Sequence, residues 1–205
     1  MAPHYWNSAK RSLSRRDPVL AAIIRNHPGI ALATRGDAFQ TLARSIVGQQ
    51  ISVKAAESVW RAFGATVVAV EPNRVLRAGL RKLAGAGLSQ RKAEYLLDLA
   101  RHFRAGKLDI AAWGTLGDEA IIDRLTEVRG IGRWTAEMFL IFNLLRPDVL
   151  PLDDLGLQRA VSLHYFSGRH VPLDDLRELG AKWLPWRSVA TWYLWRSLDP
   201  VPVEY

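Results

Sequence analysis

Two adjacent carboxylates, Asp153 and Asp154, lie in segment 150–156, which reads Leu-Pro-Leu-Asp-Asp-Leu-Gly and precedes an expected helix. A fixed carboxylate can stabilise positive charge that develops in a transition state. It can also orient or deprotonate a water molecule that acts as the nucleophile. The alternative is that both residues only cap the helix. We expect that structural role for Asp153, with Arg159 as a candidate ion-pair partner.

A glycine-containing turn is the second feature that could form a functional site. Segment 125–136 reads Leu-Thr-Glu-Val-Arg-Gly-Ile-Gly-Arg-Trp-Thr-Ala and joins two expected helices. N–H groups at the start of the second helix lack intrahelical partners and carry the positive end of the helix dipole, so a phosphate can bind there. Gly-Ile-Gly alone fits an ordinary turn better, but the whole segment and the basic chain favour a phosphate site. We expect this site to comprise Gly130, Ile131, Gly132, Arg133 and Thr135.

The charge and the residue composition restrict the class of partner. The 205 residues include 28 Lys and Arg against 20 Asp and Glu, a net charge of +8. This excess favours nucleic acid or an anionic membrane surface. No apolar run is long enough to cross a bilayer and no signal-peptide pattern is present, so nucleic acid is the expected partner. The chain contains no cysteine, which excludes disulfides, thiolate zinc sites and iron–sulfur clusters held by cysteine.

Apolar residues recur at helical spacing along most of the chain, and only residues 66–70 resemble a strand. Five isolated residues cannot form a sheet, so the expected fold class is all-α. Helices are expected to start after the caps Asp17, Asp37, Ser52 and Ser89. Further helices are expected from 118, over 133–145, after 154, over 173–181 and after Pro185. The first sixteen residues are basic without an acid, which fits a flexible arm on phosphates or a solvated tail equally well.

Four segments in combination resemble the helix-hairpin-helix DNA glycosylases, and among them the 3-methyladenine DNA glycosylase II family. They are 45–52, 87–93, 185–190 and 125–136, the last followed by Asp154 twenty residues after Trp134. The resemblance covers about residues 37–195. It implies two helical lobes with a central cleft: lobe A over about 37–146, with the hairpin at about 118–145, and lobe B over about 1–36 plus 147–205. We expect the short form, without the N-terminal β domain of longer bacterial members.

The resemblance also implies an activity. Such an enzyme flips an alkylated purine, for example 3-methyladenine or 7-methylguanine, out of the duplex and hydrolyses its N-glycosidic bond. Asp154 takes the catalytic position, facing a sugar that becomes positive as the base leaves. Trp134 and Trp195 are placed in the base pocket, where aromatic faces attract a cationic base. Met138 stands where a well-known relative has a second pocket aromatic, so the pocket is expected to be less electron-rich there.

Further roles follow from the same resemblance. Gln50 lies at the intercalating position of the DNA wedge, whereas Gln49 fits a wedge role and a polar turn between helices about equally. Strand-cleaving members carry a lysine nucleophile where this chain has Trp134, so no AP-lyase activity is expected. The family's hairpin often holds a monovalent cation, Na⁺ or K⁺, on backbone carbonyls. Here these would be the carbonyls of Thr126, Val128 and Ile131, and no other cofactor is required.

The expected partner is damaged double-stranded DNA, with no membrane and with the protein acting as a monomer. The absence of a targeting signal suggests a cytoplasmic protein at the bacterial nucleoid. Two alternatives stay open. One is a non-catalytic helix-hairpin-helix DNA-binding protein, against which Asp154 argues because a carboxylate repels DNA phosphates. The other is a glycosylase for deaminated or etheno bases, which the sequence does not exclude.

Overall fold

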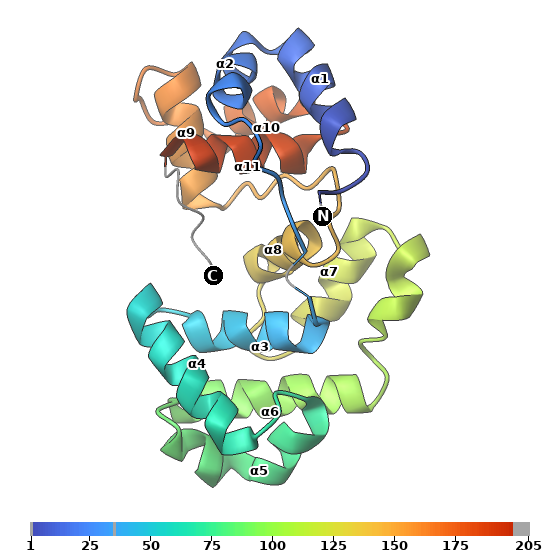
Figure 1. Ribbon diagram of the computed structural model, residues 1–205, viewed down its shortest axis with the longest axis vertical. Helices are drawn as coiled ribbons and strands as arrows, with labels where there is room; N and C mark the ends of the chain where they lie inside the picture. Colours follow the sequence, from blue (N-terminus) through green and yellow to red (C-terminus); the bar gives the residue numbers. More distant parts are fainter. Residues whose placement is uncertain (1, 35, 199–205) are drawn as a thin grey trace. The chain divides into compact units, whose positions relative to one another are not determined.

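The computed structural model describes residues 2–34 and 36–198, and it contains eleven α-helices and one 3₁₀ helix (Figure 1). No strand occurs in these residues, which confirms the expected all-α class. The described chain forms two compact units: unit 1 holds 2–34 and 140–198, and unit 2 holds 36–139. No helix in the described ranges is long and apolar enough to cross a membrane.

Unit 1 is organised around one buried helix. It contains α1 (Trp6–Arg16), α2 (Pro18–Asn26), α9 (Leu155–Tyr165), α10 (Leu173–Ala181) and α11 (Arg187–Leu198). α11 packs against α1, α2 and α9. Its residues from Ser188 to Leu194 are all buried, and small or apolar side chains surround the helix axis. A helix that is buried on every side belongs in a core, and α11 provides that core for unit 1.

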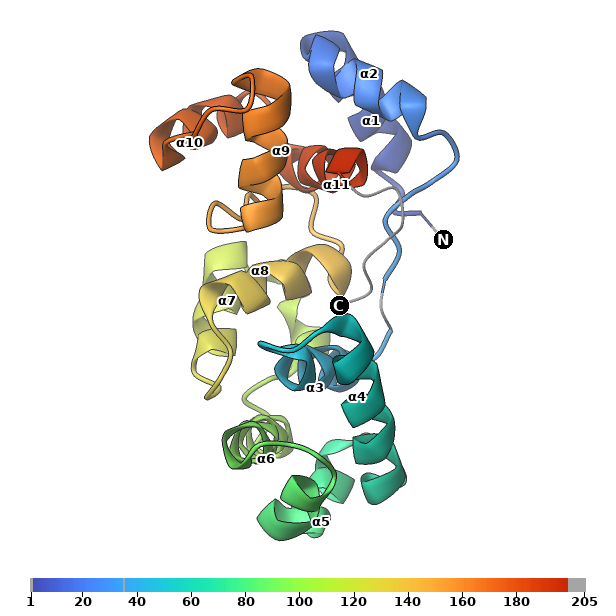
Figure 2. The same ribbon diagram turned by 90° about the vertical axis from the view of Figure 1, so that its left-hand side faces the viewer.

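Unit 2 is a second helical bundle. It contains α3 (Ala38–Gly48), α4 (Val53–Val67), α5 (Pro72–Gly85), α6 (Gln90–Arg104), the 3₁₀ helix η1 (Ile110–Thr115), α7 (Asp118–Thr126) and the first residues of α8 (Arg133–Phe142). α6 contacts both α3 and α5 and lies between them (Figure 2). Its buried face carries Ala93, Leu96, Leu97 and Ala100 at helical spacing. α6 is therefore the central helix of this unit.

The predicted helix caps are confirmed. The Asp17 carboxylate accepts from the backbone N–H groups of Val19 and Leu20 at 2.9 and 3.0 Å. Asp37 accepts from the N–H of Gln40 at 2.8 Å. The Ser52 and Ser89 hydroxyls each accept, at 3.3 Å, from the N–H group three residues later. Each cap satisfies a donor that the helix itself leaves without a partner, which explains why the helices begin here.

The N-terminal segment is not an arm or a tail, so that prediction was wrong. Residues 6–16 form α1, and Trp6, Ala9 and Leu13 on one face of it are buried. The Arg16 guanidinium donates to the Leu184 carbonyl at 2.7 Å. The apolar residues at i, i+3 and i+7 outweigh the basic charge of the segment, because burying them stabilises a helix. Residues 66–70 are not a strand either, since α4 continues to Val67.

Asp17 also connects separate parts of unit 1. Its second carboxylate oxygen accepts from the Tyr165 hydroxyl at 2.7 Å and from the Trp183 indole N–H at 3.1 Å. Burial, and then the hydrogen bond to Asp17, raise the pKa of Tyr165, so the hydroxyl keeps its proton and donates. One carboxylate, only 8% exposed, thus satisfies four donors from three segments of the chain.

We predict that Asp17→Ala lowers the free energy of unfolding by about 3 kcal/mol, because it removes a cap and leaves the buried Trp183 donor and the half-buried Tyr165 donor without their acceptor. Asp37→Ala is the matched control, since Asp37 is exposed and, among the described residues, accepts only at the start of α3. It should cost about 1 kcal/mol. Urea unfolding of both variants measures the difference. Equal losses would show that the contacts to Tyr165 and Trp183 contribute nothing.

Candidate active site

Asp154 is buried and held by two donors. Its side chain is 8% exposed. Its Oδ1 atom accepts from the backbone N–H of Leu157 at 2.6 Å and from the indole N–H of Trp195 at 2.8 Å. Two donors on one oxygen fix both the position and the plane of the carboxylate. A negative charge that is held in this way does not need to reorganise when a positive charge forms beside it.

The helix cap is Asp154 and not Asp153, so the role predicted for Asp153 was wrong. Asp154 has extended backbone angles, φ −77° and ψ 114°, and α9 begins one residue later at Leu155. The N–H of Asp154 donates to the Pro151 carbonyl at 3.0 Å, which closes a turn before the helix. Asp153 lies exposed on this turn, and no ion pair joins it to Arg159 in the described part of the chain. The predicted catalytic residue is therefore itself the helix cap.

Trp195 contributes an aromatic face as well as its N–H group. Its ring stacks on that of Phe142, with centroids 5.7 Å apart and planes 15° from parallel. Both residues belong to unit 1. Phe142 was not predicted, because it lay inside a largely apolar helix expected over 133–145, where an aromatic residue looks like ordinary core; α8 in fact ends at Phe142. Besides the base-pocket role predicted for it, Trp195 donates a hydrogen bond that orients the Asp154 carboxylate.

Position 156, two residues after Asp154, has no room for a side chain. A Cβ atom placed there would lie 3.1 Å from Asp154 Oδ1 and 3.2 Å from Trp195 Cδ1 and Nε1. These distances are shorter than ordinary van der Waals contact. Asp154 and Trp195 therefore come together over a position that has no side chain, and the Asp-Leu-Gly sequence has a steric reason.

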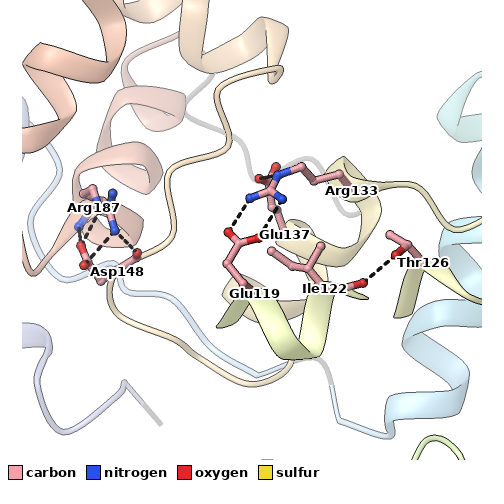
Figure 3. Close-up of polar contacts among 7 residues, drawn as sticks. All are labelled: Glu119, Ile122, Thr126, Arg133, Glu137, Asp148 and Arg187. Carbon is pink, nitrogen blue, oxygen red and sulfur yellow. Dashed lines mark hydrogen bonds and ion pairs between the residues drawn. The ribbon is translucent and has the colours of Figure 1, made fainter. Parts of the chain in front are cut away.

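The start of α11 is fixed to the segment that leads to Asp154. Arg187 donates from Nε to Asp148 Oδ1 at 2.7 Å and from Nη2 to Oδ2 at 3.0 Å (Figure 3). The N–H of Ser188 donates to the Pro147 carbonyl at 3.0 Å, and its hydroxyl accepts from the N–H of Val149 at 2.9 Å. A paired, two-point contact of this kind sets geometry as well as energy. It sets the register of α11, and with it the place of Trp195.

The predicted phosphate site forms the turn between α7 and α8 in unit 2. Gly130 has φ +89°, and a Cβ atom there would lie 2.1–2.6 Å from the Tyr95 ring, so only glycine fits. The N–H of Ile131 donates to the Val128 carbonyl at 3.0 Å, which engages it inside the turn. The N–H groups of Gly132 and Arg133 precede the first helical bond, from Ala136 to Gly132. They belong to the N–H groups at residues 132–135 that α8 does not use in its own helical bonds, and donors of this type can bind a phosphate.

The side chain of Arg133 joins α7 to α8. It donates from Nη1 and Nη2 to the two oxygens of Glu119 at 2.9 and 2.6 Å, and from Nε to Glu137 at 3.0 Å (Figure 3). The hydrogen bond to Glu119 raises the pKa of Arg133 and lowers that of Glu119. Glu137 is 5% exposed and turned toward Arg133. Any contact of Arg133 with phosphate would therefore use its backbone.

The other predicted residues also lie in unit 2. Trp134 is 37% exposed on α8, and Met138 is half-buried one helical turn later. Thr135 is buried. Gln50 is exposed and has φ +58°, while Gln49 is half-buried. The structure thus groups Asp154 and Trp195 in unit 1, and the hairpin, Trp134 and the glutamines in unit 2.

Comparison with known proteins identifies the family. Residues 43–185 match the family described as HhH-GPD superfamily base excision DNA repair protein. The chain belongs to this superfamily. This HhH-GPD protein is 34% identical to a DNA-3-methyladenine glycosidase from Bacillus halodurans of known structure, with a TM-score of 0.86 over 93% of this chain and 89% of that one.

This HhH-GPD protein is also similar to two further glycosylases. The structure of the Schizosaccharomyces pombe 3-methyladenine DNA glycosylase Mag1 with abasic DNA is 26% identical, with a TM-score of 0.79 over 96% of this chain and all (100%) of that one. A Bacillus subtilis DNA-3-methyladenine glycosylase is 29% identical over 91% of this chain. The chain spans just under two thirds of the length of the curated B. subtilis relatives that it matches, 66% and 65%.

We predict that Gly156→Ala weakens the hydrogen bond between Trp195 and Asp154, because the added methyl group pushes both side chains away by a few tenths of an ångström. The Trp195 indole N–H resonance should move upfield in a ¹H–¹⁵N spectrum. Gly114→Ala is the control, because a Cβ atom at Gly114 meets nothing within 4 Å, and it should leave this resonance in place. An unshifted resonance in Gly156→Ala would contradict the steric argument.

Proposed function

We propose that this protein is a monofunctional DNA glycosylase that hydrolyses the N-glycosidic bond of alkylated purines, such as 3-methyladenine and 7-methylguanine, in duplex DNA. The observation that carries the proposal is the geometry of Asp154, whose carboxylate is buried and fixed by the N–H groups of Leu157 and Trp195. Family membership and the names of the relatives support the same reaction.

The chemistry follows from the charge that forms when a base departs. The C1′–N bond breaks with its electron pair going to the base, which leaves positive charge on the sugar. The Asp154 carboxylate stabilises this charge and orients or deprotonates the water that adds to C1′. No covalent enzyme intermediate is needed. Because Trp134 stands where strand-cleaving members have lysine, the product is an intact strand with an abasic site.

Selectivity for alkylated bases has two sources. A purine alkylated at N3 or N7 is cationic, so it leaves more readily and it is attracted to an aromatic face. Trp134 offers such a face, since it is 37% exposed. Met138 provides a polarisable thioether instead of a second aromatic ring, which reduces the preference for a cation on that side. This substitution is the observation that favours neutral etheno or deaminated bases as a second substrate class.

Binding to DNA would use the turn at 128–132 and the basic charge of the protein. The N–H groups of Gly132 and Arg133 grip a phosphate, and Gln50 fills the space left by the flipped nucleotide. Thr126 is the last residue of α7 and Val128 lies two residues beyond it, so neither carbonyl is engaged within that helix, while the Val128 carbonyl accepts from the N–H of Ile131. With the Ile131 carbonyl they form an all-oxygen set that suits Na⁺ or K⁺ and would stiffen the turn. The protein would act as a monomer.

Base release from DNA tests the proposal. Duplexes containing 3-methyladenine, 7-methylguanine, hypoxanthine or ethenoadenine are incubated with excess protein, and the freed bases are quantified. We predict release of the two alkylated purines, with nicks only after alkali treatment. Asp154→Asn should bind the same DNA but release bases roughly 10²–10³-fold more slowly, as expected for the loss of an electrostatic stabiliser.

Asp153→Asn is the matched control, because it neutralises the neighbouring exposed carboxylate and should leave the rate nearly unchanged. Binding of damaged duplex without any base release would instead indicate a DNA-binding protein. A larger loss of rate in Asp153→Asn than in Asp154→Asn would show that the wrong carboxylate has been assigned.

A further inference from the structure

The loop between α3 and α4 has two consecutive glutamines in different environments. Gln49 has φ −55° and ψ 132° and is half-buried. Gln50 has φ +58°, a left-handed conformation that is unfavourable for a residue with a side chain, and it is exposed. Neighbouring contacts must hold such a conformation in place. Residues 49–52 are called the wedge loop below.

The contact that reaches furthest from the wedge loop is made by Gln49. Its Nε2 atom donates to the carbonyl of Gly130 at 2.8 Å, across 81 residues of sequence. Gly130 is the glycine at the centre of the turn at residues 128–132, called the hairpin turn below. Both residues belong to unit 2. The side chain of Gln49 therefore joins the wedge loop directly to the hairpin turn.

Side chains of α6 contact both the wedge loop region and the hairpin turn. Lys92 Nζ donates to the carbonyl of Val47, just before the wedge loop, at 2.8 Å. Asp98 Oδ2 accepts from the N–H of Arg129 at 3.0 Å, and the Tyr95 ring packs against Gly130. α6 thus supports the wedge loop and the hairpin turn separately, and the bond from Gln49 closes the ring between them.

We propose that Gln49 is a positioning residue, which fixes the wedge loop to the hairpin turn so that Gln50 is presented at a set distance from the phosphate site. This inference rests on the proposed base-flipping function. Inserting a side chain into a base stack needs register with the backbone that the protein grips, and pre-organised loops lower the entropy cost of binding. Gln49 would act through Gln50 and would not itself enter the DNA.

Amide hydrogen exchange tests the connection without DNA. Gln49→Glu keeps the size of the side chain but removes the donor, and Gln50→Glu is the matched control with the same added charge one residue later. In Gln49→Glu the amides of Arg129 and Ile131, which donate within and beside the hairpin turn, should exchange about ten-fold faster, since a hydrogen bond is worth about a factor of ten. In Gln50→Glu they should not change. Unchanged exchange in Gln49→Glu would overturn the proposal.

DNA binding tests whether Gln49 acts through Gln50. The probe is a duplex with a tetrahydrofuran abasic site opposite 2-aminopurine, whose fluorescence reports insertion into the stack. Gln49→Ala and Gln50→Ala should each weaken binding about ten-fold and reduce the fluorescence change. The double variant should be no weaker than Gln50→Ala alone, because coupled residues are not additive. An additive loss, about a hundred-fold, would mean that Gln49 contacts DNA independently and would overturn the proposal.

This second assay needs no base release. If the unmodified protein binds the abasic duplex but releases no base, the proposed function fails while the role of Gln49 is still decided. Thermal unfolding of each variant shows whether a loss of affinity comes from a less stable unit 2. Such a loss would lower binding, but the effects of the two substitutions would then be additive.

Discussion

The hydrogen bond from the Trp195 indole to Asp154 Oδ1 constrains how the helices of unit 1 are arranged. It joins residues 41 positions apart, at 2.8 Å, so α11 must hold a fixed register relative to the start of α9. The paired contact between Arg187 and Asp148 sets that register at the first residue of α11. Gly156 leaves the space in which the indole and the carboxylate meet. A buried helix, an ion pair and a glycine thus all serve the position of one carboxylate.

Unit 2 has a different role, because its contacts position the backbone N–H groups of the hairpin turn. Gly130 packs on Tyr95 with a positive φ, and Arg129 is held through its own N–H by Asp98. Arg133 pairs with Glu119 and Glu137, so its side chain, which is 51% exposed, links α7 to α8 across the hairpin. Surface ion pairs of this kind contribute little to stability, but a bidentate geometry restricts how two helices can move.

Local patterns in the sequence were sufficient to predict the all-α class and four helix caps, whereas the catalytic role predicted for Asp154 came from the family resemblance. These local patterns depend on residues within a few positions of one another, such as Ser89 and Lys92. The sequence did not indicate α1, because the basic charge of the segment masked the spacing of Trp6, Ala9 and Leu13. It also misplaced the cap by one residue, since Asp153 and Asp154 have the same chemistry and only the backbone angles distinguish them. Contacts such as Gln49 to Gly130 and Phe142 to Trp195 depend on tertiary structure and leave no local pattern.

The central claim is that Asp154 stabilises positive charge on a sugar. The most direct measurement compares the affinity of the protein for two duplexes, one with a cationic pyrrolidine at the abasic position and one with neutral tetrahydrofuran. The unmodified protein should bind the cationic site at least about 100-fold more tightly, and Asp154→Asn should bind both alike. Equal affinities for the two duplexes in the unmodified protein, or a preference that persists in Asp154→Asn, would contradict the claim.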